Sequence, residues 1–399
     1  MKILIITFFP YPDGGGVSTY IQLLHNVLKT MGHEVDILSH NPDRTKYYMP
    51  TNGQMTEKNI IWNSLNEKVH QFYQLHFSQT DLGIRSQEID RYAFEAVLTN
   101  YRIIDYDLIH CQDVISARAV QRIVNNKVPI ISTIHGALSL ELLLQGWIKG
   151  KETLMWNYYQ EIELSGLTSS TINIIPSKWL KNILIKEFGL AEEHFEVIPN
   201  GIDIDNFIKK MGEPSSLSPP KNKLVVVCPA RLTREKGHKF LLEALGKISR
   251  LRSDWICWLL GDGPIKKEIE RQIIQHNLQN HVFLLGRRED LPALLKQSDI
   301  VVLPSLQDNQ PFVVMEAQIS GTPIVVADAG GIPEMVEHMK TGLISASGDS
   351  ESLSANIINL LENTSLRNTL ALNAKEWGLK QWSLNTFTQR IMKIYNTVL

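Results

Sequence analysis

The chain of 399 residues is poor in cysteine and carries no excess of charge of either sign. Its three cysteines are too few and too scattered for a disulfide framework or a zinc site. They fit a reducing compartment, so we expect an intracellular, cytoplasmic protein. Forty Lys and Arg residues stand against 42 Asp and Glu residues, a formal net charge of −2. This balance argues against a dedicated nucleic-acid binder, and we expect no nucleic-acid partner.

Long apolar runs are also missing. No stretch approaches the roughly 18 consecutive apolar residues that a membrane-spanning helix needs. The apolar run at residues 3–9 has two interpretations, a short signal peptide or the buried first strand of a parallel sheet. Pro10, Pro12 and Asp13 end the run early and no small-x-small cleavage site follows, so the strand is favoured.

The chain repeats a pattern of strand, turn and helix, which predicts helices packed on parallel sheets. Runs typical of strands lie at 2–8, 33–39, 108–111, 128–133, 172–176 and 195–199, and then at 224–228, 255–260, 282–285, 300–303 and 323–327. The two series are separated by residues 209–223, whose Lys-, Pro- and Ser-rich composition is that of a linker. We therefore predict an α/β protein with two Rossmann-like domains, 1–208 and 224–383, whose parallel sheets face each other across a cleft.

The first loop suited to a ligand is Gly14-Gly15-Gly16, which opens a helix predicted over 17–31. Glycines let backbone amides approach a ligand closely, and a helix N-terminus favours an anion. A flexible turn is the alternative. The segment contains neither the dinucleotide fingerprint G-x-G-x-x-G nor the phosphate-binding G-x-x-x-x-G-K-[ST] motif.

Two further loops follow strands of the second series. Arg231 and Lys236 stand between a strand and a helix, where a planar fork and a point charge together could neutralise a diphosphate. The alternative is a solvated basic loop. Asp308 and Glu316 are eight residues apart, and Glu316 follows an apolar run. A carboxylate on a buried helix is costly unless it is paired or binds hydroxyl groups such as those of a sugar or ribose; a residue favoured by the helix dipole is the alternative.

Taken in order, these motifs resemble the GT4 family of retaining glycosyltransferases, which has the GT-B fold of two Rossmann-like domains around a cleft. The resemblance covers nearly the whole chain and is strongest over 195–345. The motifs that carry it are the N-terminal glycines, His135-Gly136, Ile198-Pro199-Asn200-Gly201-Ile202-Asp203, Arg231 with Lys236-Gly237, Gly261-Asp262-Gly263-Pro264, Asp299 with Pro304-Ser305, Asp308 with Glu316, and Gly321-Thr322-Pro323 with Gly330-Gly331.

The resemblance implies roles for single residues. In the donor-sugar motif of the family, the first acid contacts the transferred sugar and the second contacts the ribose; Asp308 and Glu316 hold these positions. Asp308 stands where Glu is usual, and Asn309 where Gly is usual, so the reach of the shorter acid to the sugar is in question. The other implied contacts are the backbone of Gln310, Pro311, Phe312 and Val313 with sugar and phosphate, Arg231 and Lys236 with the diphosphate, Gly15 and Gly16 with the phosphates, His135 with the transferred sugar, and Arg287 and Arg288 with the nucleobase.

The reaction that the resemblance implies is transfer of a sugar, with retention, from a nucleotide-diphosphate sugar to a hydroxyl acceptor. The acceptor classes are a glycan, a glycolipid or a small-molecule glycoside. We expect a UDP-sugar rather than a GDP-sugar, front-face attack, and no metal or other cofactor, since Arg231 and Lys236 would stabilise the leaving diphosphate. The pairs Asp105/Asp107 and Asp203/Asp205 have the spacing of a metal motif but arise readily by chance. The alternatives are a nucleotide-sugar epimerase or phosphorylase of the same fold, or a non-catalytic nucleotide-sugar-binding protein.

Three segments outside these motifs carry further expectations. Residues 41–100 hold scattered aromatic side chains that shape the acceptor pocket or pack in the core. Residues 178–186 form a basic amphipathic segment; an ordinary surface helix is favoured, and a weak peripheral contact with the inner face of a membrane is the alternative. The last helix, within 384–399, is predicted to pack back on the first domain.

Overall fold

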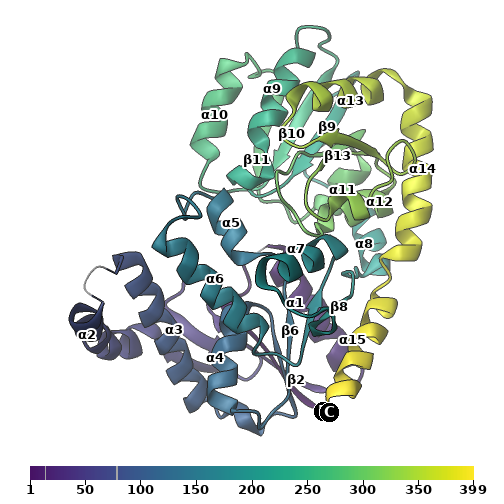
Figure 1. Cartoon of the computed structure of the whole chain (residues 1–399). Helices are drawn as coiled ribbons and strands as arrows, with labels where there is room; N and C mark the ends of the chain where they lie inside the picture. Colours follow the sequence, from purple (N-terminus) through teal and green to yellow (C-terminus); the bar gives the residue numbers. More distant parts are fainter. Residues whose placement is uncertain (14, 78–79) are drawn as a thin grey trace. The chain divides into compact units, whose positions relative to one another are not determined.

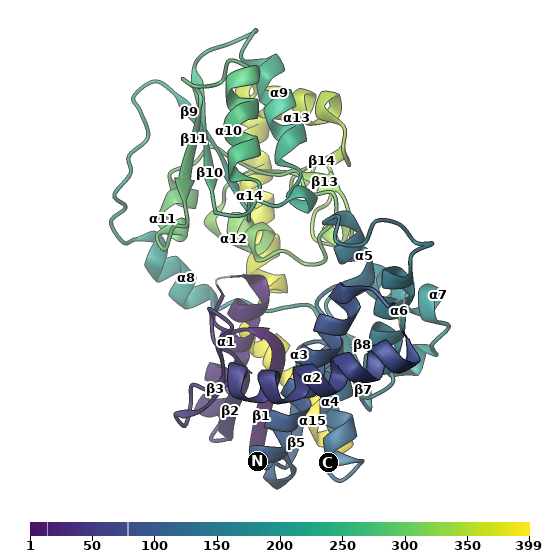
Figure 2. The ribbon, with the colours of Figure 1, turned by 90° about the vertical axis from the view of Figure 1, so that its left-hand side faces the viewer.

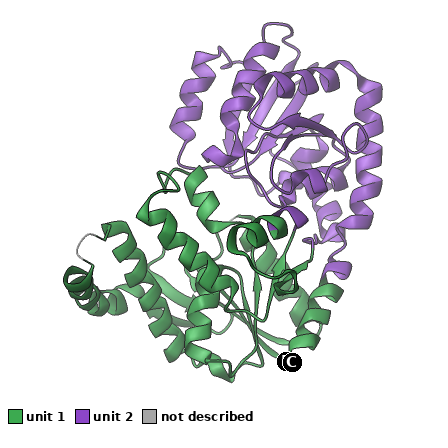
Figure 3. Ribbon diagram, viewed as in Figure 1, with its two compact units in different colours: residues 1–176, 181–198, 388–399 green, residues 177–180, 199–387 purple. Residues whose placement is uncertain are grey.

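The computed structural model describes residues 1–13, 15–77 and 80–399, which divide into two compact units (Figure 3). Unit 1 contains Met1–Pro176, Lys181–Ile198 and Thr388–Leu399, and unit 2 contains Ser177–Leu180 and Pro199–Phe387. The chain passes into unit 2 before the predicted linker at 209–223. The reason is that the turn at 199–202 bonds within unit 2: Asn200 donates its N–H to Gln310 Oε1 at 2.6 Å, and Ile202 donates to the Trp382 carbonyl at 3.0 Å.

Unit 1 is built on an eight-stranded sheet with the order β4-β3-β2-β1-β5-β6-β7-β8. Its strands are β1 (Lys2–Pro10), β2 (Glu34–His40), β3 (Lys46–Met49), β4 (Gln54–Glu57), β5 (Leu108–Cys111), β6 (Ile130–Thr133), β7 (Ile172–Ile175) and β8 (Phe195–Val197). All pairings are parallel except β2 with β3 and β3 with β4. The sequence did not predict the antiparallel strands β3 and β4, which lie at one edge.

The helices of unit 1 cover both faces of this sheet (Figures 1 and 2). They are α1 (Gly16–Thr30), α2 (Lys58–His76), α3 (Leu82–Asn100), η1 (Ile103–Asp105), α4 (Val114–Val124), α5 (Leu138–Leu144), α6 (Leu154–Leu167), α7 (Lys178–Phe188) except its first three residues, η2 (Glu192–His194) and the later part of α15 (Leu384–Val398). On β5, Ile109 and Cys111 join the apolar core formed with α3 and α4. The alternate residue His110 points to the other face, where it meets Tyr395 of α15.

Unit 2 has a six-stranded, fully parallel sheet with the order β11-β10-β9-β12-β13-β14. Its strands are β9 (Leu224–Pro229), β10 (Trp255–Leu260), β11 (Val282–Gly286), β12 (Ile300–Leu303), β13 (Ile324–Asp328) and β14 (Leu343–Ala346). Its helices are α8 (Ile204–Met211), η3 (Arg234–Lys236), α9 (His238–Ile248), α10 (Lys266–Gln275), α11 (Leu291–Lys296), α12 (Phe312–Ser320), η4 (Ile332–Glu334), α13 (Ser350–Glu362), α14 (Thr364–Gln381) and the start of α15.

Two apolar cores lie on the two faces of the unit 2 sheet. Alternate residues of β9 divide between them: Val226 and Cys228 pack with α9, α10 and α13, whereas Val225 and Val227 pack with α8, α11 and α12. A strand buried on both faces is a continuous apolar run, which is why these strands stand out in the sequence. The strands predicted at 108–111, 255–260 and 300–303 are confirmed to the residue.

The strand order reverses once in each sheet, between β1 and β5 in unit 1 and between β9 and β12 in unit 2. Ligands of open α/β sheets bind outside the carboxyl ends of the strands at such a point. The loops after β1, β5, β9 and β12 are therefore the places to look for a site in each unit. Among the described residues, no helix combines the length and apolar composition that crossing a membrane would require.

Candidate active site

Arg231 and the loop after β12 lie at the point of strand reversal in unit 2. Arg231 follows the end of β9 by two residues, and its side chain is 57% exposed, with Nη2 3.7 Å from Glu235 Oε1. Neighbouring backbones pack closely against this loop: a Cβ on Gly261, whose φ is +150°, would lie 2.0 Å from the Ala230 carbonyl oxygen. The exposed guanidinium is thus carried on a tightly held loop and is available to a ligand.

Lys236 and Asp308, two of the predicted site residues, form an ion pair with Nζ 2.5 Å from Oδ2. Both side chains are mostly buried, at 16% and 14% exposure. The Asp308 carboxylate also accepts hydrogen bonds from Ser305 Oγ at 3.3 Å and from the Asn309 N–H at 3.2 Å. Three donors therefore occupy this acid, which is one methylene shorter than the glutamate that the motif usually carries.

Gly237 allows the loop of Lys236 to approach the loop after β12. Its φ is +69°, and a Cβ there would lie 1.9 Å from the Pro304 carbonyl oxygen. A hydrogen bond from the Leu306 N–H to the Glu235 carbonyl, at 2.7 Å, joins the same two loops. These loops are separate motifs in the sequence, and the backbone contact brings them together.

Glu316 lies in the second turn of α12, whose other residues are largely buried in the core. Its carboxylate is partly buried and makes no hydrogen bond or ion pair with the described part of the chain. Burial raises the pKa of Glu316 to about 7. Helix α12 also lacks a side-chain cap at its N-terminus, where Pro311 is the N-cap residue. An unpaired acid and an uncapped helix start are both features that a bound ligand would satisfy.

The side chains of Asn309 and Gln310 are engaged within unit 2. The Ser177 hydroxyl donates a hydrogen bond to Asn309 Oδ1, and Gln310 Oε1 accepts the Asn200 N–H. Phe312 and Val313 are half-buried and pack on the core. These contacts leave the backbone of the segment, rather than its side chains, as the part that could meet a ligand.

Arg288 is held by a neighbouring acid. Its guanidinium forms a two-point contact with Asp290, at 2.8 Å and 2.6 Å, and Nη2 also donates to Ser216 Oγ at 2.7 Å. Ser216 belongs to the segment predicted as a linker, so Arg288 ties that segment to the end of β11. Arg287, beside it, also has an interaction partner.

The glycine loop of unit 1 precedes α1. Gly15 is the N-cap residue of this helix, and Gly16 is its first residue; Gly14 lies outside the described residues. The Asp13 carboxylate accepts hydrogen bonds from the Gly15 N–H at 2.8 Å and the Ser18 hydroxyl at 2.7 Å. An acid of this chain therefore already stands where an anionic ligand was expected.

His135 follows β6 and is half-buried. Its Nε2 lies 3.2 Å from Gln112 Oε1, and its ring meets the Tyr20 ring edge-on at 4.8 Å between centroids. Burial lowers the pKa of His135 to about 4, so the imidazole is neutral at pH 7. The side chain can exchange hydrogen bonds with a sugar but brings no positive charge.

Sequence reasoning missed a buried acid that supports the His135 loop. Glu163 of α6 is fully buried and accepts the N–H groups of Leu138 and Ser139, at 2.7 and 3.0 Å, and the Ser139 hydroxyl at 2.6 Å. It therefore caps α5, which begins three residues after His135. The available signal was an acid placed between the apolar residues Ile162 and Leu164.

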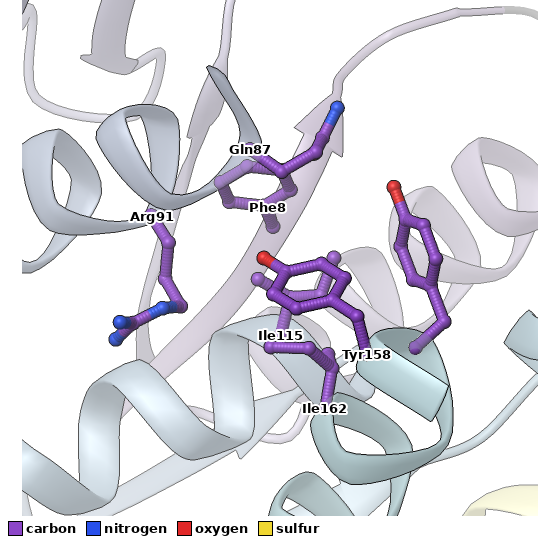
Figure 4. Close-up of a pocket in the computed structure, with 7 residues that line it drawn as sticks. Phe8, Gln87, Arg91, Ile115, Tyr158 and Ile162 are labelled. Atoms are coloured by element: carbon purple, nitrogen blue, oxygen red, sulfur yellow. The ribbon is translucent and has the colours of Figure 1, made fainter. Parts of the chain in front are cut away.

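A small pocket, partly open to solvent, lies in unit 1 beside the carboxyl end of β1. The Tyr158 ring lies near Phe8 and Ile115 (Figure 4). Arg91, in the wall, is neutralised by Glu88 at 2.7 Å and Glu95 at 2.5 Å. The residues lining the pocket are Phe8, Gln87, Arg91, Ile115, Tyr158, Tyr159 and Ile162.

One acid of each pair with metal-motif spacing has a structural role. Asp203 caps α8 by accepting the Asn206 N–H at 3.0 Å, and Asp107 accepts the Lys2 N–H at 2.7 Å. Within the described residues, no three His, Cys, Asp or Glu side chains are grouped so that they could hold a metal ion. In the basic segment at 178–186, the apolar residues Leu180 and Leu184 are fully buried.

Two family models match the chain in succession. Residues 14–206 match Glycosyltransferase Family 4, and residues 212–377 match Glycosyl transferases group 1. An uncharacterised glycosyltransferase of Methanocaldococcus jannaschii is 24% identical over 99% of this chain and 98% of its own length. A UDP-Gal:α-D-GlcNAc-diphosphoundecaprenol α-1,3-galactosyltransferase of Escherichia coli is 25% identical over 75% of this chain and 79% of its own.

Solved structures are also similar to this chain. The crystal structure of Anabaena HepE in complex with UDP-glucose aligns over the whole of both chains with a TM-score of 0.71 at 21% identity. Together with the two family models, this likeness confirms the predicted fold class. The chain belongs to the GT4-type glycosyltransferases and has their GT-B fold.

Proposed function

We propose that this protein transfers a sugar from a UDP-sugar to a hydroxyl acceptor with retention of configuration and without a metal ion. Unit 2 would bind the donor, and unit 1 would bind the acceptor and contribute His135, Gly15 and Gly16. The observation that carries the proposal is the partly buried carboxylate of Glu316, which has no partner among the described residues and lies at the point of strand reversal in unit 2. A carboxylate in such a place is costly until hydroxyl donors satisfy it, and the two hydroxyls of a ribose are suited to that task.

The charge of unit 2 suits departure of a nucleoside diphosphate. Breaking the bond between sugar and phosphate builds negative charge on the leaving group. Arg231, exposed on its held loop, and Lys236 supply positive charge, and the uncapped start of α12 at Phe312 and Val313 supplies backbone N–H groups. These groups support a reaction in which the protein's own cations do the work that a metal ion does in other transferases.

The sugar of the donor would meet Asp308 and the backbone of the segment from Asn309 to Val313. Because Asp308 is bound to Lys236, we propose that it acts on the donor partly by holding the ammonium in place. For the uracil end we place the base near Arg288, at the loop after β11. Support for a uridine donor comes from HepE, whose crystal structures contain UDP and UDP-glucose.

Retention is supported by the chemistry of the residues that carry the proposal. A double displacement would need a free carboxylate beside the anomeric carbon, and Asp308, the acid expected at the sugar, is paired with Lys236. We propose front-face attack, in which the acceptor hydroxyl gives its proton to the departing phosphate. The acceptor, a glycan, glycolipid or small-molecule glycoside, would enter beside the aromatic pocket at Phe8 and Tyr158, where rings can lie against sugar C–H surfaces.

Measurements of donor binding and of turnover test the proposal. Isothermal titration should give saturable binding of UDP-glucose, or of another UDP-sugar from a panel, that Glu316→Ala abolishes and Arg231→Ala weakens. With a hydroxyl acceptor found by screening, NMR of the product should show the anomeric configuration of the donor. Inverted product would refute retention, and turnover of the donor without an acceptor to an epimer, or to a sugar phosphate with added orthophosphate, would refute the transferase assignment. Turnover that persists in excess EDTA is expected, and a loss restored by Mg²⁺ or Mn²⁺ would refute metal independence.

A further inference from the structure

A buried chain of hydrogen bonds runs through unit 1 from its C-terminal helix toward His135. His110 on β5 is fully buried, with Nδ1 2.7 Å from the Tyr395 hydroxyl and Nε2 2.7 Å from Thr133 Oγ1. The Thr133 hydroxyl lies 2.9 Å from the Tyr20 hydroxyl. Tyr395 is on α15, Thr133 ends β6, and Tyr20 is on α1. Four elements that are distant in sequence are therefore joined through polar groups in an otherwise apolar interior.

This chain of hydrogen bonds is complete with a neutral histidine. If Tyr395 donates to Nδ1, then Nε2–H donates to Thr133 and the Thr133 hydroxyl donates to Tyr20. If the directions are reversed, Tyr20 donates to Thr133, Thr133 to Nε2, and Nδ1–H to Tyr395. Both tautomers use every ring nitrogen, so no buried donor or acceptor of His110 is lost in either case. Burial of the His110 ring is acceptable because both of its nitrogens have partners.

The network ends on both sides of His135. The Tyr20 ring packs edge-on against the His135 imidazole at 4.8 Å. From the other side, Gln112 Oε1 meets His135 Nε2 at 3.2 Å, while the amide nitrogen of the same glutamine donates to the His110 carbonyl at 3.5 Å. His110 thus supports His135 through its ring, by way of Thr133 and Tyr20, and through its backbone, by way of Gln112.

Tyr20 also couples the network to the glycine loop. It lies in the second turn of α1, which begins at Gly16, and the Thr133 hydroxyl fixes its phenol against β6. A shift of Tyr20 would therefore move the start of α1 and the imidazole of His135 together. Replacing both partners of a buried hydrogen bond by apolar groups of the same shape can be nearly neutral for stability, so stability alone does not require a polar chain from Tyr395 to this point.

We propose that Tyr395, His110 and Thr133 are positioning residues, which hold Tyr20 and through it the His135 imidazole and the start of α1 in the geometry that turnover needs. The assignment of His135 to turnover rests on the proposed function. The network itself rests on the distances above. The C-terminal helix would accordingly contribute to the reaction through one hydroxyl group at a distance from the substrate.

Four variants test the proposal. Thr133→Val removes the hydroxyl at nearly constant shape, Thr133→Ser keeps it, and Tyr395→Phe removes the hydroxyl that His110 meets. Tyr106→Phe is the matched control, because Tyr106 is buried and its hydroxyl donates to Asp36 at 2.7 Å next to the start of β1, away from the network. Circular dichroism and thermal unfolding establish that each variant is folded, and Tyr395→Phe decides the matter if Thr133→Val does not fold.

The first measurement is hydrolysis of UDP-glucose in the absence of acceptor. In Thr133→Val and Tyr395→Phe we expect kcat to fall about tenfold while KM stays within about twofold, since misplacement of a group affects the reacting geometry more than donor binding. Thr133→Ser should restore kcat to near the wild-type value, and Tyr106→Phe should leave it unchanged. If the role were purely structural, the unfolding temperature would fall in all the hydroxyl-deleting variants and kcat would stay at the wild-type value in each of them. That result would overturn the proposal.

The second measurement does not depend on activity. NMR of the protein labelled with ¹³C and ¹⁵N in histidine gives the ring resonances of His135, assigned by their loss in His135→Asn. They should move in Thr133→Val and in Tyr395→Phe and stay in place in Tyr106→Phe. Unchanged His135 resonances in both network variants would overturn the positioning role. A wild-type protein that turns over no UDP-sugar while these resonances respond as expected would contradict the proposed function and leave the positioning role of the network supported.

Discussion

The substitution Glu316→Gln should stabilise the protein and abolish donor binding at the same time. The rise in the pKa of Glu316 from its ordinary value of 4.5 to about 7 corresponds to about 3 kcal/mol. Because the unfolded chain binds fewer protons than the folded one between pH 4.5 and 7, the free energy of unfolding falls as pH rises through this window. Above pH 7 the folded protein carries the whole cost of an unpaired carboxylate, and glutamine removes it.

Chemical denaturation as a function of pH measures this effect. The difference in unfolding free energy between Glu316→Gln and the wild type should be near zero at pH 4 and rise to as much as about 3 kcal/mol at pH 8. Glu337→Gln is the control, because Glu337 is 62% exposed and its pair with Lys340 is a surface contact. It should change the unfolding free energy by less than about 0.5 kcal/mol at every pH.

Donor binding should show the opposite dependence on pH. Only the ionised Glu316 can accept hydrogen bonds from both hydroxyls of a ribose, and with a pKa of about 7 some 3% of it is ionised at pH 5.5. The Kd of UDP-glucose, whose diphosphate does not titrate in this range, should therefore be about 30-fold higher at pH 5.5 than at pH 8. In Glu316→Gln the Kd should be high and independent of pH. A variant that binds UDP-glucose as tightly as the wild type, or that gains no stability at pH 8, would refute the reasoning.

Three other substitutions separate the roles of residues in both units. Arg231→Ala should lower turnover about 100-fold by loss of roughly 3 kcal/mol of charge stabilisation. Its unfolding free energy should stay within about 0.5 kcal/mol of wild type, because the Arg231 side chain is 57% exposed. Arg250→Ala, at an exposed site in the same unit, should change neither turnover nor unfolding free energy. Gly237→Ala should abolish donor binding, and its loss of stability should be several times that of Gly286→Ala. Both glycines have a φ of +69°, but only at Gly237 would the new Cβ meet a carbonyl oxygen, at 1.9 Å. Equal losses of stability in urea denaturation would contradict the close approach of the two loops. Glu163→Gln should cost about 1–3 kcal/mol in urea denaturation, because one of the buried donors at the start of α5 loses its acceptor, and a neutral result would show that the cap is dispensable.

The sequence predicts the interior strands of the sheets because a strand buried on both faces is a continuous run of apolar residues. The run at 255–260 is apolar at every position, and β10 has the predicted bounds. The edge strand β4, with the sequence Gln-Met-Thr-Glu, is mostly exposed and contains no such run. β4 is a strand because it pairs with β3, and the residues of β4 alone do not indicate that pairing.

For the candidate site, the sequence predicts which residues are present and leaves their pairing open. Lys236 and Asp308 are 72 residues apart, and their contact depends on the reversal of strand order between β9 and β12. The contact of Arg288 with Ser216 also joins residues 72 apart, whereas its pair with Asp290 is local. The sequence does indicate that His110 has hydrogen-bond partners, since a histidine within the apolar run Leu-Ile-His-Cys needs them if it is buried.

Comparison of the buried acids argues most strongly that Glu316 is there for a ligand. Asp113 accepts hydrogen bonds from Thr7, Phe8 and Ser116, at 2.7–2.9 Å, so that capping α4 explains its burial. Glu163 accepts hydrogen bonds from three donors, and Glu88 accepts hydrogen bonds from Arg91 and from the Tyr158 hydroxyl. Each of these acids compensates its desolvation with partners supplied by the fold. Glu316 has none in the described part of the chain, and a fold selected for stability alone would place an apolar residue on that turn of α12. The partners that would compensate its burial must then come from outside the chain, and two adjacent hydroxyls on a nucleoside are donors of the required kind.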